Sequence, residues 1–208
     1  MKTATGLRQA RALGLALVLA ACRGAHGEPS AEAIDPRSAP QQDDLGSAAA
    51  VALPTTGDAT FTALARYRIA ARVLSKERYY AGWRGAISPL DLALGWGAMS
   101  DPAVDRFIEW YQRGRWYFWQ WDAGSPYRNE AIREHSANVH VIPATRNLRR
   151  ALLALDEGEI VRLSGFLVDA AGPEGDRWRS SLSRTDTGDQ SCEVFYVEEL
   201  AAGGRVYR

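Results

Sequence analysis

At residues 159–168 the chain reads EIVRLSGFLV, the clearest strand in the sequence. Val161, Leu163 and Leu167 recur with the period of an extended chain, so they share one face. Gly165 interrupts the strand and indicates a β-bulge or a tight coil of the sheet. The pattern therefore predicts a curled sheet in the last third of the chain.

Two more strands are expected at residues 177–184 and 192–199, on either side of the turn residues 186–189. A long strand with an internal glycine, followed by two hairpin-linked strands, resembles the start of a small OB- or SH3-like barrel. The other strands of such a barrel would come from residues 115–121, which are dense in aromatic strand formers, and from residues 138–142.

Helical patterns dominate the part of the chain before this sheet. Phe61, Ala65, Ile69 and Val73 recur at four-residue steps and predict a helix. The other predicted helices begin at Ser88-Pro89, at Asp101-Pro102, near residue 127 and after Thr145. The expected fold class is α+β, with N-terminal helices packed on a small curled antiparallel sheet in one domain over residues 59–202.

The N-terminus has the three zones of an export signal. Residues 1–21 contain three basic residues and no acidic ones, and Ala12–Ala21 is an apolar run too short to span a bilayer. The following Leu19-Ala20-Ala21-Cys22 resembles the lipobox of bacterial lipoproteins. The resemblance implies cleavage before Cys22 and acylation of that cysteine, for example with palmitate. Arg23, in place of a retention aspartate, implies the periplasmic face of the outer membrane rather than the inner membrane.

Residues 22–58 are rich in Ala, Pro, Gly, Ser and Asp and have no apolar period. Such a segment buries too little surface to become ordered, so it predicts a flexible tether. Residues 203–208 are expected to be a short tail. The chain has 25 basic and 25 acidic residues, and three of the basic ones lie in the signal. The remainder is mildly acidic, which argues against a nucleic-acid partner.

A thiol constellation is the clearest candidate for catalysis. Cys192 together with His135 or His140, and Asn138 to orient the imidazole, contains the residue types of a cysteine nucleophile. The alternative is that Cys192 is a small buried apolar residue, because it opens an apolar strand rather than a helix. The two histidines are five residues apart, a spacing that does not suit a shared metal ion, so no metal or cofactor is expected.

Two further features are candidates for ligand binding. An aromatic block surrounds Trp116 and Trp119, and indole rings on a surface suit stacking on sugars or burial in an interface. Arg115 would supply a polar edge to such a groove. Asp186, with Arg184 before it, lies in an Asp-Thr-Gly triplet like that of aspartic proteases, but a polar hairpin turn explains the same residues and no second triplet exists.

Several longer strings resemble an uncharacterised bacterial protein family over about residues 60–200. They are residues 79–82, 88–97, 135–144, 181–188 and 192–198. The resemblance implies no activity, but it suggests that six polar residues are worth testing as one cluster. They are His135, Asn138, His140, Arg184, Asp186 and Cys192.

The expected function is that of a non-catalytic, membrane-anchored periplasmic lipoprotein. Its domain would bind a protein, a peptide or an envelope glycan. The alternative is a thiol-dependent hydrolase or transferase that uses Cys192 with His135 or His140.

Overall fold

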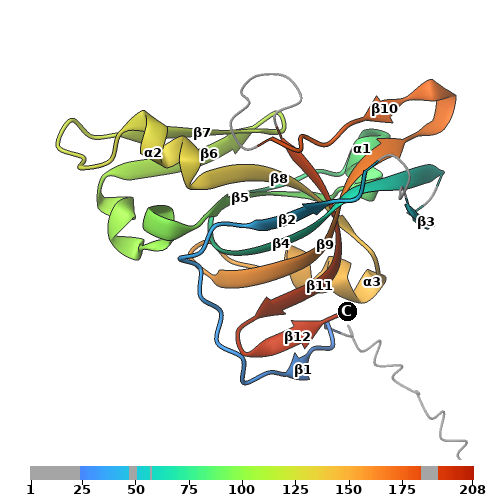
Figure 1. Ribbon diagram of the computed structural model, residues 1–208, viewed down its shortest axis with the longest axis horizontal. Coiled ribbons are helices and arrows are strands. Elements are labelled where there is room, and N and C mark those ends of the chain that lie inside the picture. Colours follow the sequence, from blue (N-terminus) through green and yellow to red (C-terminus); the bar gives the residue numbers. More distant parts are fainter. Residues whose placement is uncertain (1–23, 47–50, 57, 184–191) are drawn as a thin grey trace, which may run out of the picture.

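The structure is a computed structural model that describes residues 24–46, 51–56, 58–183 and 192–208 (Figure 1). Over these residues it is mostly β, with three short α-helices. The strands are β1 (Glu28–Pro29), β2 (Gln41–Asp44), β3 (Val51–Thr56), β4 (Ala59–Arg78), β5 (Leu90–Gly95), β6 (Ile108–Arg113), β7 (Trp116–Trp121), β8 (Ser136–Pro143), β9 (Ile160–Ala171), β10 (Arg177–Trp178), β11 (Glu193–Ala202) and β12 (Arg205–Tyr207). The helices are α1 (Gly82–Ile87), α2 (Asn129–Glu134) and α3 (Arg146–Leu153), with 3-10 helices η2 (Gly97–Ser100), η3 (Pro102–Arg106) and η4 (Pro173–Gly175).

Five of the strands close into a barrel (Figure 1). Their order around the ring is β4, β5, β8, β11 and β9, and β9 pairs with β4 to complete it. The β8–β11 pair is parallel, whereas the other four pairs are antiparallel. Helix α3 lies between β8 and β9 in the chain. This strand order, with one parallel pair, is the connectivity of an OB-fold barrel, a small five-stranded Greek-key barrel.

The predicted fold class is wrong, because the structure is mostly β and two of the predicted N-terminal helices are strands. In β4 the buried residues alternate from Ala59 to Ala71, which is the period of a strand with one face in the core. Residues four apart share a face on a strand as well as on a helix, so Phe61, Ala65, Ile69 and Val73 fit both patterns. The intervening Ala63, Tyr67 and Ala71, which are also buried, decide for the strand.

The helix predicted to start at Ser88-Pro89 is also a strand. All residues of β5 are buried, because β4 and β8 flank it within the barrel wall and other elements cover both of its faces. The start predicted at Asp101-Pro102 is real but short. The Asp101 side chain accepts a hydrogen bond from the Ala103 backbone N–H at 2.8 Å, and η3 ends at Arg106.

The make-up of the predicted barrel needs correction too. Residues 115–121 do not join the barrel, since β7 pairs with β6 in a separate two-stranded sheet. Residues 177–184 supply only the two-residue strand β10 within their described part. The strands predicted at residues 138–142, 159–168 and 192–199 are confirmed as β8, β9 and β11. The helices near residue 127 and after Thr145 are confirmed as α2 and α3.

The described part of the predicted tether belongs to the sheet. β1 pairs with β12 at one end of the molecule, and β2 and β3 pair with β4. The predicted tail likewise contains β12, which pairs with β11. Backbone pairing with an existing sheet edge needs few apolar side chains, so the composition of residues 22–58 did not indicate these strands. Among the described residues, no helix is long and apolar enough to cross a membrane.

At Gly165 the backbones of β9 and β11 leave no room for a side chain. A Cβ at this position would overlap the carbonyl oxygen of Tyr196 on β11 and crowd the Glu198 backbone nitrogen. The β9–β11 register shifts nearby, between Val197 and Glu199, as the sequence pattern predicts for a bulge. The pair that closes the barrel therefore depends on the missing side chain at Gly165.

We predict that Gly165→Ala lowers the free energy of unfolding by about 3 kcal/mol or more, because either β9 or β11 must move to admit the methyl group. Urea denaturation followed by circular dichroism measures this. Gly124→Ala is the matched control, since nothing lies within 4 Å of a Cβ placed there. Equal stabilities for the two variants would contradict the close approach.

Candidate functional site

A cavity of about 620 Å³ opens where three inter-strand loops meet beside the barrel. The loop between β4 and β5 contributes α1, the β6–β7 hairpin contributes its turn, and the loop after β9 contributes β10 (Figure 1). Strand β8 contributes His140, and Cys192 lies immediately before β11, the parallel neighbour of β8. The lining residues are Arg84, Gly114, Arg115, Trp116, His140, Arg177, Trp178, Arg179 and Cys192.

The carboxylate of Asp91 lies fully buried beneath this cavity. The Arg115 guanidinium donates to Asp91 Oδ1 at 2.7 Å and to the Ser88 carbonyl oxygen at 3.0 Å. On the other side, His140 Nδ1 lies 2.9 Å from Asp91 Oδ2, although the approach is too oblique for a well-formed hydrogen bond. Asp91 and His140 face each other on neighbouring strands, so the barrel register itself sets this contact.

Arg115 is held in place by an unusual backbone conformation. It is the second of two turn residues between β6 and β7, with φ of 62° at Gly114 and 72° at Arg115. Positive φ at both positions defines the tight hairpin turn, but it costs a side-chain-bearing residue about 1–3 kcal/mol. Two hydrogen bonds offset this cost. The Arg115 N–H donates to Tyr79 Oη at 2.7 Å, and the Arg115 carbonyl accepts from Asn138 Nδ2 at 2.9 Å.

Asn138 connects this turn to the cysteine. Its Nδ2 also lies 3.6 Å from Cys192 Sγ, while its Oδ1 accepts a hydrogen bond from Gln112 Nε2 at 2.6 Å. Cys192 is partly exposed and immediately precedes β11, next to Asn138 in the parallel register. His140 is two residues beyond Asn138 on β8 and therefore points to the same side of the sheet. The strand pairing thus places Cys192 and His140 on one cavity.

Tyr117 on β7 lies beside the site, against Ser136 at the start of β8. Its Oη lies 3.2 Å from Ser136 Oγ. Burial raises the pKa of Tyr117 to about 12, and the nearby Glu193 and Cys192 add to the effect. The phenol therefore stays protonated and neutral throughout the physiological range.

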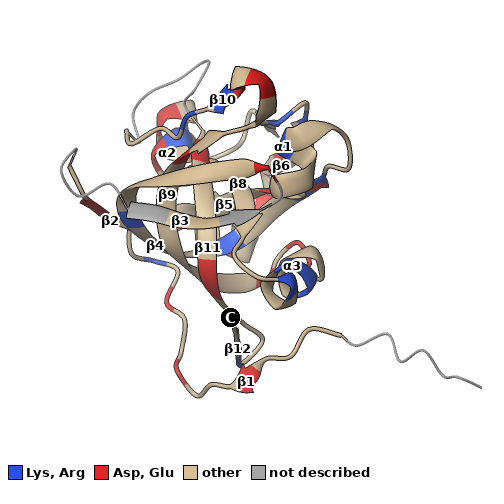
Figure 2. Cartoon of the chain, turned by 90° about the vertical axis from the view of Figure 1, so that its right-hand side faces the viewer, with Lys and Arg blue, Asp and Glu red and all other residues tan. Residues whose placement is uncertain are grey.

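The rim of the cavity is strongly basic. Among the described residues, no carboxylate forms an ion pair with Arg84, Arg177 or Arg179. Figure 2 shows basic residues of β10 and α1 at the top of the molecule. Burial lowers the pKa of Arg115, the Asp91 carboxylate opposes that shift, and the positive charge of Arg84 adds to it. The cavity therefore carries an excess of positive charge.

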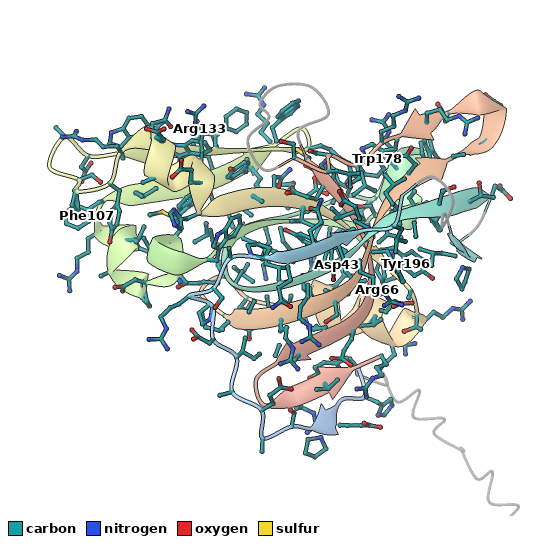
Figure 3. All side chains as sticks on the ribbon, viewed as in Figure 1. Asp43, Arg66, Phe107, Arg133, Trp178 and Tyr196 are labelled. Carbon is teal, nitrogen blue, oxygen red and sulfur yellow. The ribbon has the colours of Figure 1, made fainter. Side chains whose placement is uncertain are left out.

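Trp178, labelled in Figure 3, packs against several of these groups. The guanidinium carbons of Arg84 and Arg115 lie 5.2 and 5.0 Å from its ring centroid, at cation–π distance. The His140 ring lies 4.7 Å from it on a third side. Trp178 is buried, and its ring packs against all three of these groups.

Some of the residues singled out in the sequence meet here and others do not. Arg115, Trp116, His140 and Cys192 line the cavity, and Asn138 lies behind them. His135 is elsewhere: its Nδ1 lies 2.9 Å from the Ala131 carbonyl oxygen, and its ring packs against Gly97. The predicted single cluster of polar residues is therefore wrong for His135.

Trp119 is also outside the cavity. Its indole donates to Asn129 Oδ1 at 3.1 Å and packs against Trp110 at a centroid distance of 6.1 Å. On the outer face of the same small sheet, Tyr111 and Phe118 stack at 5.2 Å and remain exposed. Arg184, Asp186 and Cys22 lie outside the described residues.

The sequence interpretation missed Arg84, Asp91, Arg177, Trp178 and Arg179. Asp91 was assigned to a helix start, because it follows Ser88-Pro89. Residues 177–179 alternate Arg, Trp and Arg, a pattern that could have indicated a basic aromatic surface. No sequence pattern pointed to Arg84, because only the fold brings α1 against β10. There Arg84 donates a hydrogen bond to the Arg177 carbonyl oxygen at 3.2 Å.

Comparison of the chain with protein-family models, with curated proteins and with solved structures gives no match. The site itself is therefore the basis for a functional argument. Among the described residues, no three His, Cys, Asp or Glu side chains are grouped so as to hold a metal ion.

We predict that Arg115→Ala destabilises the protein by about 3 kcal/mol, because it leaves the buried Asp91 carboxylate without its cation. Urea denaturation is the measurement. Arg113→Ala is the matched control, two residues away in the same hairpin and exposed, and we expect a change below about 0.5 kcal/mol. A similarly small effect at Arg115 would show that Asp91 does not depend on it.

Proposed function

We propose that this chain is an envelope lipoprotein whose barrel domain binds a ligand carrying an anionic group. One observation carries the proposal. Arg84, Arg177 and Arg179 surround a concave site without a carboxylate partner among the described residues. Unpaired cations on a cavity rim attract anions, and guanidinium groups match carboxylate and phosphate geometry.

The cavity also favours a ligand with a flat apolar surface. Trp116 lines it and is only partly buried, and an accessible indole ring suits stacking on a sugar ring. A volume of about 620 Å³ is in the range of small-molecule sites rather than of protein interfaces. An acidic envelope glycan, or the anionic end of a peptide, fits these properties better than a folded protein partner does.

The place of the cavity in the fold supports a binding role. OB-fold barrels bind ligands on the face of their second and third strands and in the loops beside them. Here β5 and β8 are the second and third strands of the ring, and the loop after β4 supplies Arg84. This support is an analogy at the level of fold.

The proposed lipid anchor is compatible with access to the cavity. The first described residues lead into β1, which pairs with β12 at the bottom of Figure 1, whereas α1, β10 and the β6–β7 hairpin lie at the top. A domain attached through Cys22 on the periplasmic face of the outer membrane would therefore present its cavity away from that membrane. Such an orientation suits a ligand in the cell envelope.

We predict that glucuronate, a sugar carboxylate, changes the tryptophan fluorescence of the full chain carrying Cys22→Ser, whereas glucose does not. Trp116 and Trp178 report from the cavity itself. The double variant Arg84→Gln/Arg177→Gln should weaken glucuronate binding at least about tenfold, since it removes two charge-assisted contacts.

The matched control is Arg146→Gln/Arg150→Gln, which removes the same charge from exposed positions on α3. Its affinity should equal that of the parent chain. An equal loss in both double variants, or an equal response to glucose, would show non-specific attraction and overturn the proposal.

The lipid anchor has its own test. We predict that the bacterial membrane fraction contains the chain, that the chain incorporates labelled palmitate, and that Cys22→Ala abolishes the labelling. Cys192→Ala is the control and should leave the label unchanged, because Cys22 and Cys192 are the two cysteines of the sequence. Labelling that survives Cys22→Ala would contradict acylation at the lipobox.

A further inference from the structure

We propose that Cys192 is a nucleophile that takes an acyl group from an anionic ester or amide bound in this cavity, with His140 as its proton acceptor. The proposal rests on the proposed anion site, because the arginines would hold the substrate's charged group. It goes beyond binding, since it assigns a reaction to the same cavity.

The thiol of Cys192 is placed where a ligand could contact it. Cys192 lines the cavity and is partly exposed, so a bound molecule can reach its sulfur. Asn138 Nδ2 lies 3.6 Å from Sγ, and that amide is held in turn by Gln112 and by the Arg115 carbonyl. An N–H donor fixed beside a sulfur stabilises the thiolate.

The imidazole of His140 is oriented by its neighbours. Its side chain is only 5% exposed, yet it lines the cavity. The Nδ1 edge faces the Asp91 carboxylate at 2.9 Å, and the ring rests against Trp178. Because Nδ1 lies against the Asp91 carboxylate, Nε2 is the ring nitrogen left to exchange a proton with a group in the cavity. Asp91 thus acts as a positioning residue for the imidazole.

The surroundings of Cys192 and His140 are positively charged. Basic groups face the cavity from α1 (Arg84), from the hairpin turn (Arg115) and from β10 (Arg177 and Arg179). The opposing charges are Asp91 on β5, which is paired with Arg115, and Glu193 on β11, while Tyr117 on β7 stays neutral. Cations therefore outnumber anions, which favours a thiolate over a thiol.

The reaction follows from these groups. Sγ of Cys192 bonds to the acyl carbon, and the bond from that carbon to its leaving oxygen or nitrogen breaks. The thiol proton passes to His140 and from there to the leaving group. Water then attacks the thioester, gives up one proton through His140 to the departing sulfur, and releases a carboxylic acid. The overall reaction is hydrolysis and needs no reactant besides water.

The test uses the full chain carrying Cys22→Ser, so that Cys192 is its single cysteine. The probe is the p-nitrophenyl monoester of succinic acid, an activated ester with a carboxylate. We expect a burst of nitrophenolate and one succinyl group on Cys192 by mass spectrometry. Cys192→Ala should abolish both, and His140→Gln should slow acylation at least about a hundredfold, which is typical for loss of a general base.

His135→Gln is the matched control and should acylate at the parent rate, because His135 lies outside the cavity. Asp91→Asn tests the positioning role: without the carboxylate the imidazole is less well oriented, so kcat for acylation should fall while KM stays nearly unchanged. Glucuronate-dependent fluorescence checks that each variant keeps a folded site.

Two results would overturn the proposal. One is a parent chain that binds glucuronate but is not acylated and reacts with iodoacetamide no faster than the urea-unfolded chain; that result leaves the binding function intact. The other is an acylation rate that His140→Gln and His135→Gln change equally. A chain that is acylated but does not respond to glucuronate would instead contradict the proposed anion site.

Discussion

The buried carboxylate of Asp91 is the charge on which the site depends. A carboxylate with no exposed surface is costly to bury unless cations and hydrogen-bond donors surround it. Arg115 meets that need from one side and His140 faces it from the other. Because Arg115 belongs to the β6–β7 hairpin, the same ion pair fastens this hairpin to the barrel. One charge thus couples the stability of the fold to the geometry of the cavity.

The barrel supplies the rigid frame for this arrangement. Pairing of β8 with both β5 and β11 puts His140 beside Asp91 and aligns Asn138 with Cys192. These contacts follow from backbone register and need no loop to adopt a particular conformation. The loops then add what the strands cannot supply, namely the arginines of α1 and β10 and the strained turn at Arg115. Strain held at such a point is typical of functional sites.

Part of the fold and part of the site could be predicted from sequence. The strands at 159–168 and 138–142 and the helix after Thr145 follow from local patterns, and the structure has them as β9, β8 and α3. The thiol, His140, Asn138, Arg115 and Trp116 were singled out because their chemistry is distinctive. The N-terminal half was predicted wrongly, since four-residue spacing is common to helices and strands and the small Ala63 and Ala71 gave weak evidence for alternation.

The sequence by itself determined the candidate lipid anchor, the curled C-terminal strands and the chemical types present in the site. These properties depend on residues close together in the chain, where periodicity and motif spacing carry the information. Only the tertiary structure decided that His140 rather than His135 lies on the cavity with Cys192, and that Arg84 and Arg177 meet there. The physical reason is that strand register and loop packing bring these groups together across long stretches of chain, which no local pattern encodes.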